Sequence, residues 1–277
     1  MKYFVISDLH SFATEVKAVL RKAGFNKKNK NHTLIVCGDV FDRGDESLEL
    51  YKYLKSIPKK RCILVKGNHE TLYFELLKKD WPHYYDATNG TLKTFFNIAE
   101  KPYTTYILEN EWLNIRDYVA GHEVTKWLKS DQWVDYFELD RFIFVHSFIP
   151  ATWNWRENAT ANDWENARWG NPWKQYKAGI FSADKENGKT LVVGHWHTWD
   201  FHEQLGGEKK STNRNIYYSD HLIALDGGVI NDGWELIPHP NVLVIDDLDF
   251  SVCTDQNGSN LVNMEVSPND RQFIRPL

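Results

Sequence analysis

Short apolar runs recur along the chain, and most of them stop at a glycine or a polar residue. Such runs predict buried strands. The predicted strands cover residues 3–6, 33–37, 61–65, 133–139, 142–145, 190–193, 222–225 and 241–245. After each of the first three, apolar residues return at helical spacing and predict helices over residues 14–22, 48–54 and 72–77. Strands that alternate with helices favour an α/β fold with a mostly parallel sheet.

The alternating pattern stops at about residue 81. Up to about residue 132 the chain is rich in aromatic residues and predicts helices, among them 92–99 and 111–128. We therefore expect a helical insert, which either caps a cleft or adds a structural layer. A Trp-rich loop region is expected at about 150–175, where indole rings either stack on a ligand or pack the loop onto the domain. Since no linker or repeat divides residues 1–277, a single domain is predicted.

Composition and charge narrow the class of protein. Hydrophobic residues make up 42% of the chain and charged residues 26%, which is typical of a soluble globular protein. The net charge is −5 and the pI is near 6.1, so the chain has no overall positive charge to attract a nucleic acid backbone. Binding to duplex nucleic acid is therefore not expected.

Several features predict a cytoplasmic protein. The N-terminal residues lack the long apolar region of a signal peptide, and no apolar stretch is long enough to span a bilayer, so no membrane association is expected. Cys37, Cys62 and Cys253 lie far apart without a paired spacing and are expected to be reduced thiols of the core.

Polar side chains of the types that bind metal ions follow five of the predicted strands. They are Asp8, His10, Asp39, Asn68, His146, His195 and His197. Carboxylate, amide oxygen and imidazole groups together are ligands for manganese, iron or zinc, whereas magnesium and calcium take mostly oxygen. The set is too large for one ion. Two neighbouring ions need a bridging carboxylate, and Asp39, at the end of the central strand, is the candidate.

Five sequence blocks at these strand ends resemble the signature motifs of the calcineurin-like metallophosphoesterases. The blocks are Asp8-Leu9-His10, Gly38-Asp39-Val40-Phe41-Asp42-Arg43-Gly44, Gly67-Asn68-His69-Glu70, His146 and Gly194-His195-Trp196-His197. The second and third are most similar to those of the bacterial and phage phosphoprotein phosphatases and the diadenosine tetraphosphatases. The resemblance implies a four-layer α/β/β/α sandwich with a dimetal site between two sheets.

The resemblance also implies a role for each matching residue. Asp8, His10 and Asp39 would hold the first metal, and Asp39, Asn68, His146 and His195 the second, with His197 as a further ligand of the first. Manganese is the expected metal, with iron or zinc as alternatives. His69 would protonate the leaving oxygen, and Asp42 would orient His69. Arg43 would donate hydrogen bonds to two phosphate oxygens at once.

Two positions depart from the family pattern. Ser147-Phe148 follows His146 where a small residue and glycine are usual, and Lys66 stands where bacterial members often have arginine. Lysine still meets a phosphate as a point charge. A further phosphate-binding arginine is expected from the later loops, where Arg168 is the candidate and Arg156 and Arg214 compete with it.

The expected function is metal-dependent hydrolysis of phosphate monoesters, on phosphoserine, phosphothreonine or small phosphate esters. Two cations would lower the pKa of a bridging water and neutralise phosphate oxygens, so that a hydroxide attacks phosphorus in line with the departing group. The alternative substrate is a dinucleoside polyphosphate or another nucleotide. A third reading is a noncatalytic, metal-bearing interaction module, and the presence of His69 and Asp42 argues against it.

Overall fold

The computed structural model describes residues 1–233, 235–247 and 252–254, the last three by backbone alone. The strands are β1 (Lys2–Ile6), β2 (His32–Cys37), β3 (Cys62–Val65), β4 (Trp133–Val134), β5 (Phe137–Leu139), β6 (Phe142–Phe144), β7 (Thr190–Val193), β8 (Tyr217–Ser219), β9 (Leu222–Ala224), β10 (Asp226–Asn231), β11 (Leu236–Pro240), β12 (Leu243–Asp246) and β13 (Val252–Thr254). The helices are α1 (Ala13–Lys22), α2 (Ser47–Lys55), the short 3₁₀ helix η1 (Lys59–Arg61), α3 (Asn68–Leu76), α4 (Tyr84–Thr88), α5 (Thr91–Ile98), α6 (Thr105–Gly121), α7 (Glu123–Leu128), α8 (Trp155–Asn158), α9 (Ala161–Trp169), α10 (Pro172–Lys177) and α11 (Thr198–Gln204).

The strands form two main sheets and one hairpin. The first sheet has the order β13-β12-β1-β2-β3-β4, the second has the order β5-β6-β7-β9-β8, and β10 pairs with β11. Strands β1 to β4 run parallel to one another, as do β6, β7 and β9, whereas β12 and β5 join their sheets antiparallel. The α/β prediction with a mostly parallel arrangement is therefore confirmed.

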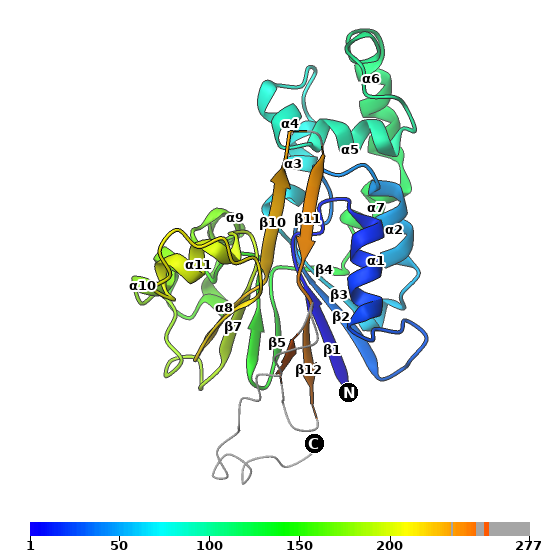
Figure 1. Cartoon of the computed structure of the whole chain (residues 1–277). Helices are drawn as coiled ribbons and strands as arrows, with labels where there is room; N and C mark the ends of the chain where they lie inside the picture. The colour runs from blue at the N-terminus through cyan, green and yellow to red at the C-terminus, as the bar shows by residue number, and fades with distance from the viewer. Residues whose placement is uncertain (234, 248–251, 255–277) are drawn as a thin grey trace.

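Four layers result because both sheets are apolar on their two faces. Phe4 and Ile6 face the helices that cover the first sheet, whereas Val5 and Ile35 point into a core shared with the second sheet. The outer face of the second sheet carries Leu191 and packs under α8 to α11. Figure 1 shows the two sheets side by side at the centre, with α1 and α2 flanking one and α8 to α11 flanking the other. This is the α/β/β/α sandwich that the resemblance implied.

Helices α4 to α7 occupy the stretch where the sequence predicts a helical insert. Phe95, Trp112 and Trp127 are buried in the same core as Phe41 and Tyr73, which belong to the β2 loop and α3. This shared core continues the helical layer of the first sheet, and it brings α5 close to the end of β2. None of the helices in the described part of the chain combines the length and apolarity that a bilayer crossing requires.

The strand predicted at 133–139 is wrong as a single element. Residues 133–134 pair with β3 in the first sheet, whereas residues 137–139 pair with β6 in the second. Asp135 and Tyr136 form the crossing between the two sheets. The alternating pattern of this stretch fits both halves, so it gives no sign of the change of sheet.

The prediction of reduced core thiols can be checked for two of the three cysteines. Cys37 and Cys62 are buried free thiols, in agreement with the prediction of core residues, whereas the side chain of Cys253 lies outside the described residues. Burial raises the pKa of the Cys62 thiol to about 12. The polar tail predicted from residue 256 onward also lies outside the described part.

Candidate metal centre

The predicted site residues converge at one end of the two sheets. Asp8 and His10 follow β1, Asp39 follows β2, and Asn68 opens α3 directly after β3. His146 and His195 follow β6 and β7 of the second sheet. Because parallel strands deliver their carboxyl ends to the same edge, residues far apart in the sequence meet there.

The loops that carry these residues are strained. Asp8, His10, Asp39, Asp42, Arg43 and His195 all have φ between 44° and 77°. This left-handed region is unfavourable for residues with a side chain, and it persists only where the surroundings enforce it. Six such residues around one point are typical of a functional site and not of ordinary turns.

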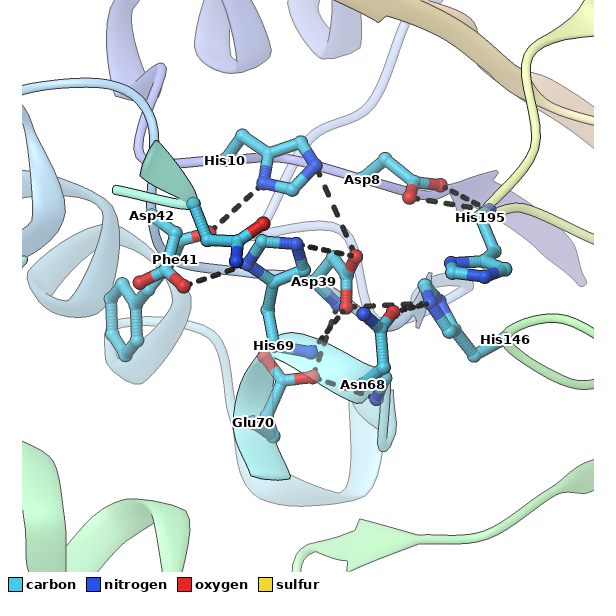
Figure 2. A network of polar contacts seen from close by, with 12 residues as sticks. Asp8, His10, Asp39, Phe41, Asp42, Asn68, His69, Glu70, His146 and His195 are labelled. Atoms are coloured by element: carbon cyan, nitrogen blue, oxygen red, sulfur yellow. Dashed lines mark hydrogen bonds and ion pairs between the residues drawn. The ribbon is translucent and has the colours of Figure 1, made fainter. Parts of the chain in front are cut away.

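Asp39 lies at the centre of the cluster (Figure 2). Its Oδ2 is 3.9 Å from Nε2 of His10 and 3.8 Å from Nε2 of His69, and its Oδ1 is 3.4 Å from Nε2 of His146. Two groups of side chains could each hold a metal ion, one formed by His10, Asp39 and His69 and the other by Asp39, His146 and His195. In each group the ligand atoms lie within 4.8 Å of one another, and Asp39 belongs to both.

Backbone carbonyls fix the orientation of two of these histidines. Nδ1 of His10 lies 3.0 Å from the Phe41 carbonyl, and Nδ1 of His146 lies 2.9 Å from the Cys37 carbonyl. Only a protonated Nδ1 can donate to a carbonyl, so in the neutral ring Nε2 keeps its lone pair and points at the cluster. Metal-binding histidines are commonly held by this kind of outer hydrogen bond.

Two side-chain oxygens lie close to Nε2 of His146. Oδ1 of Asn68 lies 2.8 Å from Nε2 of His146, and Oδ1 of Asp39 is also close to that nitrogen. With the proton on Nδ1, three electron-rich atoms converge without a hydrogen between them, which is unfavourable unless a cation lies there. The donor set therefore fits the metal that the sequence predicts.

The electrostatics of the buried groups agree with a cation site. Burial lowers the pKa of His10 well below its usual value, and it lowers that of His195 to about 3, so both rings are neutral and keep a lone pair. Burial, together with Asp226 and Asp39, raises the pKa of Asp8 well above its usual range. Crowded buried carboxylates of this kind are stabilised by a divalent ion.

Glu70 ties two of the loops together. Its carboxylate accepts hydrogen bonds from the backbone N–H groups of Asp39 at 3.1 Å, Val40 at 2.9 Å and Gly67 at 2.7 Å. Gly67 has no room for a side chain, since a Cβ there would overlap Asp39. These contacts fix the β2 loop relative to the start of α3, and so fix Asp39 relative to Asn68.

His69 and Asp42 form a buried pair beside the cluster. Nδ1 of His69 donates to Oδ2 of Asp42 at 2.7 Å, and both side chains are almost completely buried. Burial lowers the pKa of His69, but the carboxylates of Asp39 and Asp42 outweigh this and hold it above its usual value. An imidazole held in this way can donate a proton from Nε2.

Two predicted ligands with a carboxylate or imidazole group lie outside both groups. The carboxylate of Asp8 accepts from the backbone N–H of His195 at 3.0 Å, so it joins the two sheets at the cluster without belonging to either group. Nδ1 of His197 lies 3.0 Å from Oδ2 of Asp226, and His197 is also absent from both groups of the described residues. The ligand roles of Asp8 and His197, like those of the other predicted ligands, stay predictions.

Asp226 lies beside the predicted site residues and is not among those that the sequence predicts. It is buried, it pairs with His197, and its Oδ1 accepts from the backbone N–H of Gly228 at 2.7 Å. Burial raises the pKa of Asp226, but the bond from His197 outweighs this and holds it below its usual value. The signal was present in the sequence, because Asp226 also follows an apolar strand directly.

The predicted phosphate-binding cations differ in their partners. Nζ of Lys66 lies 3.2 Å from Oδ1 of Asp135, and Arg168 pairs with the same oxygen, so one carboxylate holds both. The guanidinium of Arg43 makes no hydrogen bond or ion pair within the described residues. Its charge is the second cause, after burial, of the lowered pKa of His10. Asp135, like Asp226, was missed.

The two competing arginines are engaged elsewhere. Arg156 pairs with Glu138 and Glu186, and it lies over the ring of Trp155 at 4.1 Å. Arg214 donates to the backbone carbonyls of Gly227 and Gly228. Both arginines therefore hold the fold, and Arg168 remains the candidate of the later loops.

The tryptophans of the loop region divide into two kinds. Trp155 and Trp164 are buried in the core of the second sheet, so packing is their role. Trp169 is 40% exposed, and its ring meets the ring of His195 edge-on at 6.3 Å between centroids. Of the two expectations for this region, packing holds for most rings and proximity to the site holds for Trp169.

Comparison with known proteins agrees with this architecture. A cold-active protein tyrosine phosphatase of known structure has a TM-score of 0.56 at 17% identity, covering 91% of this chain and 76% of that one, which shows a common fold. The chain is 27% identical to Shewanella-like protein phosphatase 1 of Plasmodium berghei (strain Anka), covering 89% of this chain and 72% of that protein.

A second group of relatives is formed by tetraphosphatases. The chain is 28% identical over 154 residues to the symmetrical bis(5'-nucleosyl)-tetraphosphatase of Buchnera aphidicola subsp. Acyrthosiphon pisum (strain Tuc7), covering 56% of this chain. It spans only 47% of that relative's length. The sequence pattern of the calcineurin-like phosphoesterases matches residues 1–225, which include every predicted metal ligand, His69 and Asp42. The chain belongs to the calcineurin-like phosphoesterase family.

Proposed function

We propose that this protein is a metal-dependent phosphatase that hydrolyses phosphate monoesters, with phosphoserine, phosphothreonine or small phosphate esters as substrates. One observation carries the proposal: His10 and His146 converge on Asp39, with Asn68 against His146, next to the buried His69–Asp42 pair. A site that served only as a structural metal centre would have no use for a proton donor. This pair therefore argues against a noncatalytic interaction module.

The proposed metal ligands are the predicted ones. Asp8, His10 and Asp39 would hold one ion, Asp39, Asn68, His146 and His195 the other, and His197 would complete the first set. Manganese is the proposed metal, with iron or zinc as alternatives. Two divalent ions at such a site supply an activated water and positive charge for the phosphate oxygens.

The other residues act on the substrate directly. His69 is placed to donate its Nε2 proton to the leaving oxygen, because its Nδ1 is fixed by Asp42. Arg43 has a guanidinium without a protein partner in the described residues and can take two phosphate oxygens. Lys66 and Arg168, which share Asp135, would add positive charge at the rim.

Phosphate release from a phosphoserine peptide tests the proposal. The metal-stripped protein is assayed after addition of manganese, iron, zinc or magnesium in turn. We expect turnover with at least one of the first three and almost none without metal. The His69→Asn variant is the control, because it removes the proposed proton donor and keeps the seven proposed ligands. Its metal content is compared with that of wild type, since His69 belongs to one of the two groups. A wild-type protein that binds these ions and releases no phosphate from any ester would overturn the proposal.

A dinucleoside polyphosphate is the second candidate substrate. The position of Trp169 beside His195 favours it, since an exposed indole ring at the site can stack on a base. Trp169→Ala should then slow cleavage of diadenosine tetraphosphate and leave phosphopeptide hydrolysis nearly unchanged. An equal effect of this variant on both substrates would remove the argument for a nucleotide.

A further inference from the structure

The first turn of α5 contacts the proton-donor pair. Oγ1 of Thr91 donates to Oδ2 of Asp42 at 2.6 Å, and Oγ1 of Thr94 donates to Oδ1 at 2.8 Å. The two threonines lie 49 and 52 residues after Asp42 in the sequence. All three side chains are buried without exposure to solvent, so water cannot replace these bonds.

Thr94 also holds the backbone of Asp42. Its hydroxyl accepts from the N–H of Asp42 at 3.0 Å while it donates to the carboxylate of the same residue. Asp42 has φ of 77°, a backbone conformation that residues with a side chain rarely adopt. The single hydroxyl of Thr94 therefore stabilises both the strained backbone of Asp42 and the direction of its carboxylate.

Gly90 allows α5 to approach so closely. It precedes the helix with φ of 85°, and a Cβ at this position would overlap the backbone N and Cα of Arg43. The N-terminus of the helix thus lies directly on Asp42 and Arg43, where the positive end of the helix dipole favours a carboxylate. The absence of a side chain at Gly90 therefore permits direct contact between the start of α5 and the backbone of Arg43.

Together these contacts leave Asp42 with one orientation. Oδ1 binds Thr94, and Oδ2 is shared between Thr91 and Nδ1 of His69 at 2.7 Å. Without the hydroxyls, Oδ1 would have no donor in a buried place, and the carboxylate could turn away from the histidine. The bond to His69 is the only one of the three that the sequence blocks suggest.

We propose that Thr91 and Thr94 are positioning residues of the reaction, which fix Asp42 so that His69 presents Nε2 to the leaving oxygen. This inference rests on the proposed phosphatase function. It gives the helical insert a role in catalysis that is neither a lid nor a mere structural layer. The competing explanation is that the hydroxyls only attach the insert to the body of the protein.

Leaving groups of different basicity separate the two explanations. A dinitrophenolate departs without a proton, whereas the serine alkoxide of a phosphopeptide needs one, so only the second reaction depends on His69. We expect Thr91→Val and Thr94→Val to lower kcat for the phosphoserine peptide by about 10- to 100-fold, with KM nearly constant. The loss on dinitrophenyl phosphate should be much smaller. Thr91→Ser and Thr94→Ser should restore the peptide reaction, since serine keeps the hydroxyl.

Two further measurements test the same point. In the His69→Asn background the valine substitutions should have no additional effect on the peptide reaction, as a double-mutant cycle requires for residues acting through His69. In the metal-free protein, the downfield proton resonance of the His69 Nδ1–H, assigned by its absence in His69→Asn, should shift or broaden in the valine variants. Where valine prevents folding, Thr94→Ala and the serine variants provide the same comparison.

Equal losses on both phosphate esters, or serine variants as slow as the valine variants, would overturn the inference and leave the structural explanation. An unchanged peptide reaction in both valine variants would overturn it as well. Failure of the proposed function looks different, because the wild-type protein would then release no phosphate from either ester.

Discussion

Nε2 of His146 lies 2.8 Å from Oδ1 of Asn68, although neither atom carries a proton when Nδ1 of His146 donates to the Cys37 carbonyl. Two lone pairs at this distance repel each other. The contact is therefore where we propose that a cation binds, and it connects the residue that opens α3, after β3 of the first sheet, with a residue that follows β6 of the second.

The first prediction follows from this contact. His146→Ala should lower the manganese content of the protein from about two ions per chain to about one, because the second group loses a ligand while the first keeps His10 and Asp39. Metal analysis after dialysis against a fixed manganese concentration measures this. His202→Ala, a change on α11 away from the cluster, serves as the control. A full complement of metal in the His146 variant would contradict the assignment.

Substitution of Asp39 should lower the activity more than substitution of any other proposed ligand. Since its carboxylate belongs to both groups, Asp39→Asn weakens both ions at once and should abolish metal-dependent phosphatase activity, a loss of more than about 100-fold. The measurement is phosphate release over a range of manganese concentrations. Near-normal turnover in this variant at any metal concentration refutes the shared site.

Arg168 and Arg156 should respond differently to the same substitution. Arg168→Lys should raise KM for a phosphopeptide by about tenfold, because lysine cannot present two donors to one phosphate, and it should leave the melting temperature nearly constant. Arg156→Lys should leave KM unchanged and lower the melting temperature by about 2–4 °C, since it weakens the contacts with Glu138, Glu186 and Trp155. If the two variants exchanged these effects, Arg156 would be the phosphate ligand.

His239 should make stability depend on pH. Burial and the charge of Arg214 lower its pKa from the usual 6.5 to about 4, so the unfolded chain binds a proton more readily than the folded one. Its contribution to stability is therefore present above pH 6.5 and lost as the pH falls toward 4.

Replacement of His239 by glutamine tests this dependence. His239→Gln should flatten the fall in stability between these pH values relative to wild type, as measured by urea unfolding of the metal-free protein at several pH values. Parallel curves for the two proteins would show that His239 is not responsible.

The sequence could predict the cluster because its residues share one local sequence pattern: an apolar strand is followed by a polar side chain. This pattern needs no knowledge of partners, and it places Asp39, Asn68, His146 and His195 at the same edge once the sheets are parallel. The same pattern was available for Asp226. It was overlooked because its strand comes late in the chain, after the last block of the family resemblance.

The outer partners could not be predicted in this way. Thr91 and Thr94 read as ordinary residues at the start of a helix, and their bonds to Asp42 depend on how the insert folds back over the β2 loop. Asp135 reads as the polar position of one alternating strand. Its position becomes clear only when that strand divides between the two sheets.

The crossing at Asp135 couples the proposed phosphate-binding residues Lys66 and Arg168 to the geometry of the whole sandwich. Lys66 extends from the first half of the molecule and Arg168 from the second, and the carboxylate that joins them sits in the link between the halves. Ile35 and Val192 pack in the core between the two sheets, so we expect their packing to influence the separation of the two cations. We therefore expect substitutions in that interior to change affinity for a phosphate ester by altering the spacing of Lys66 and Arg168.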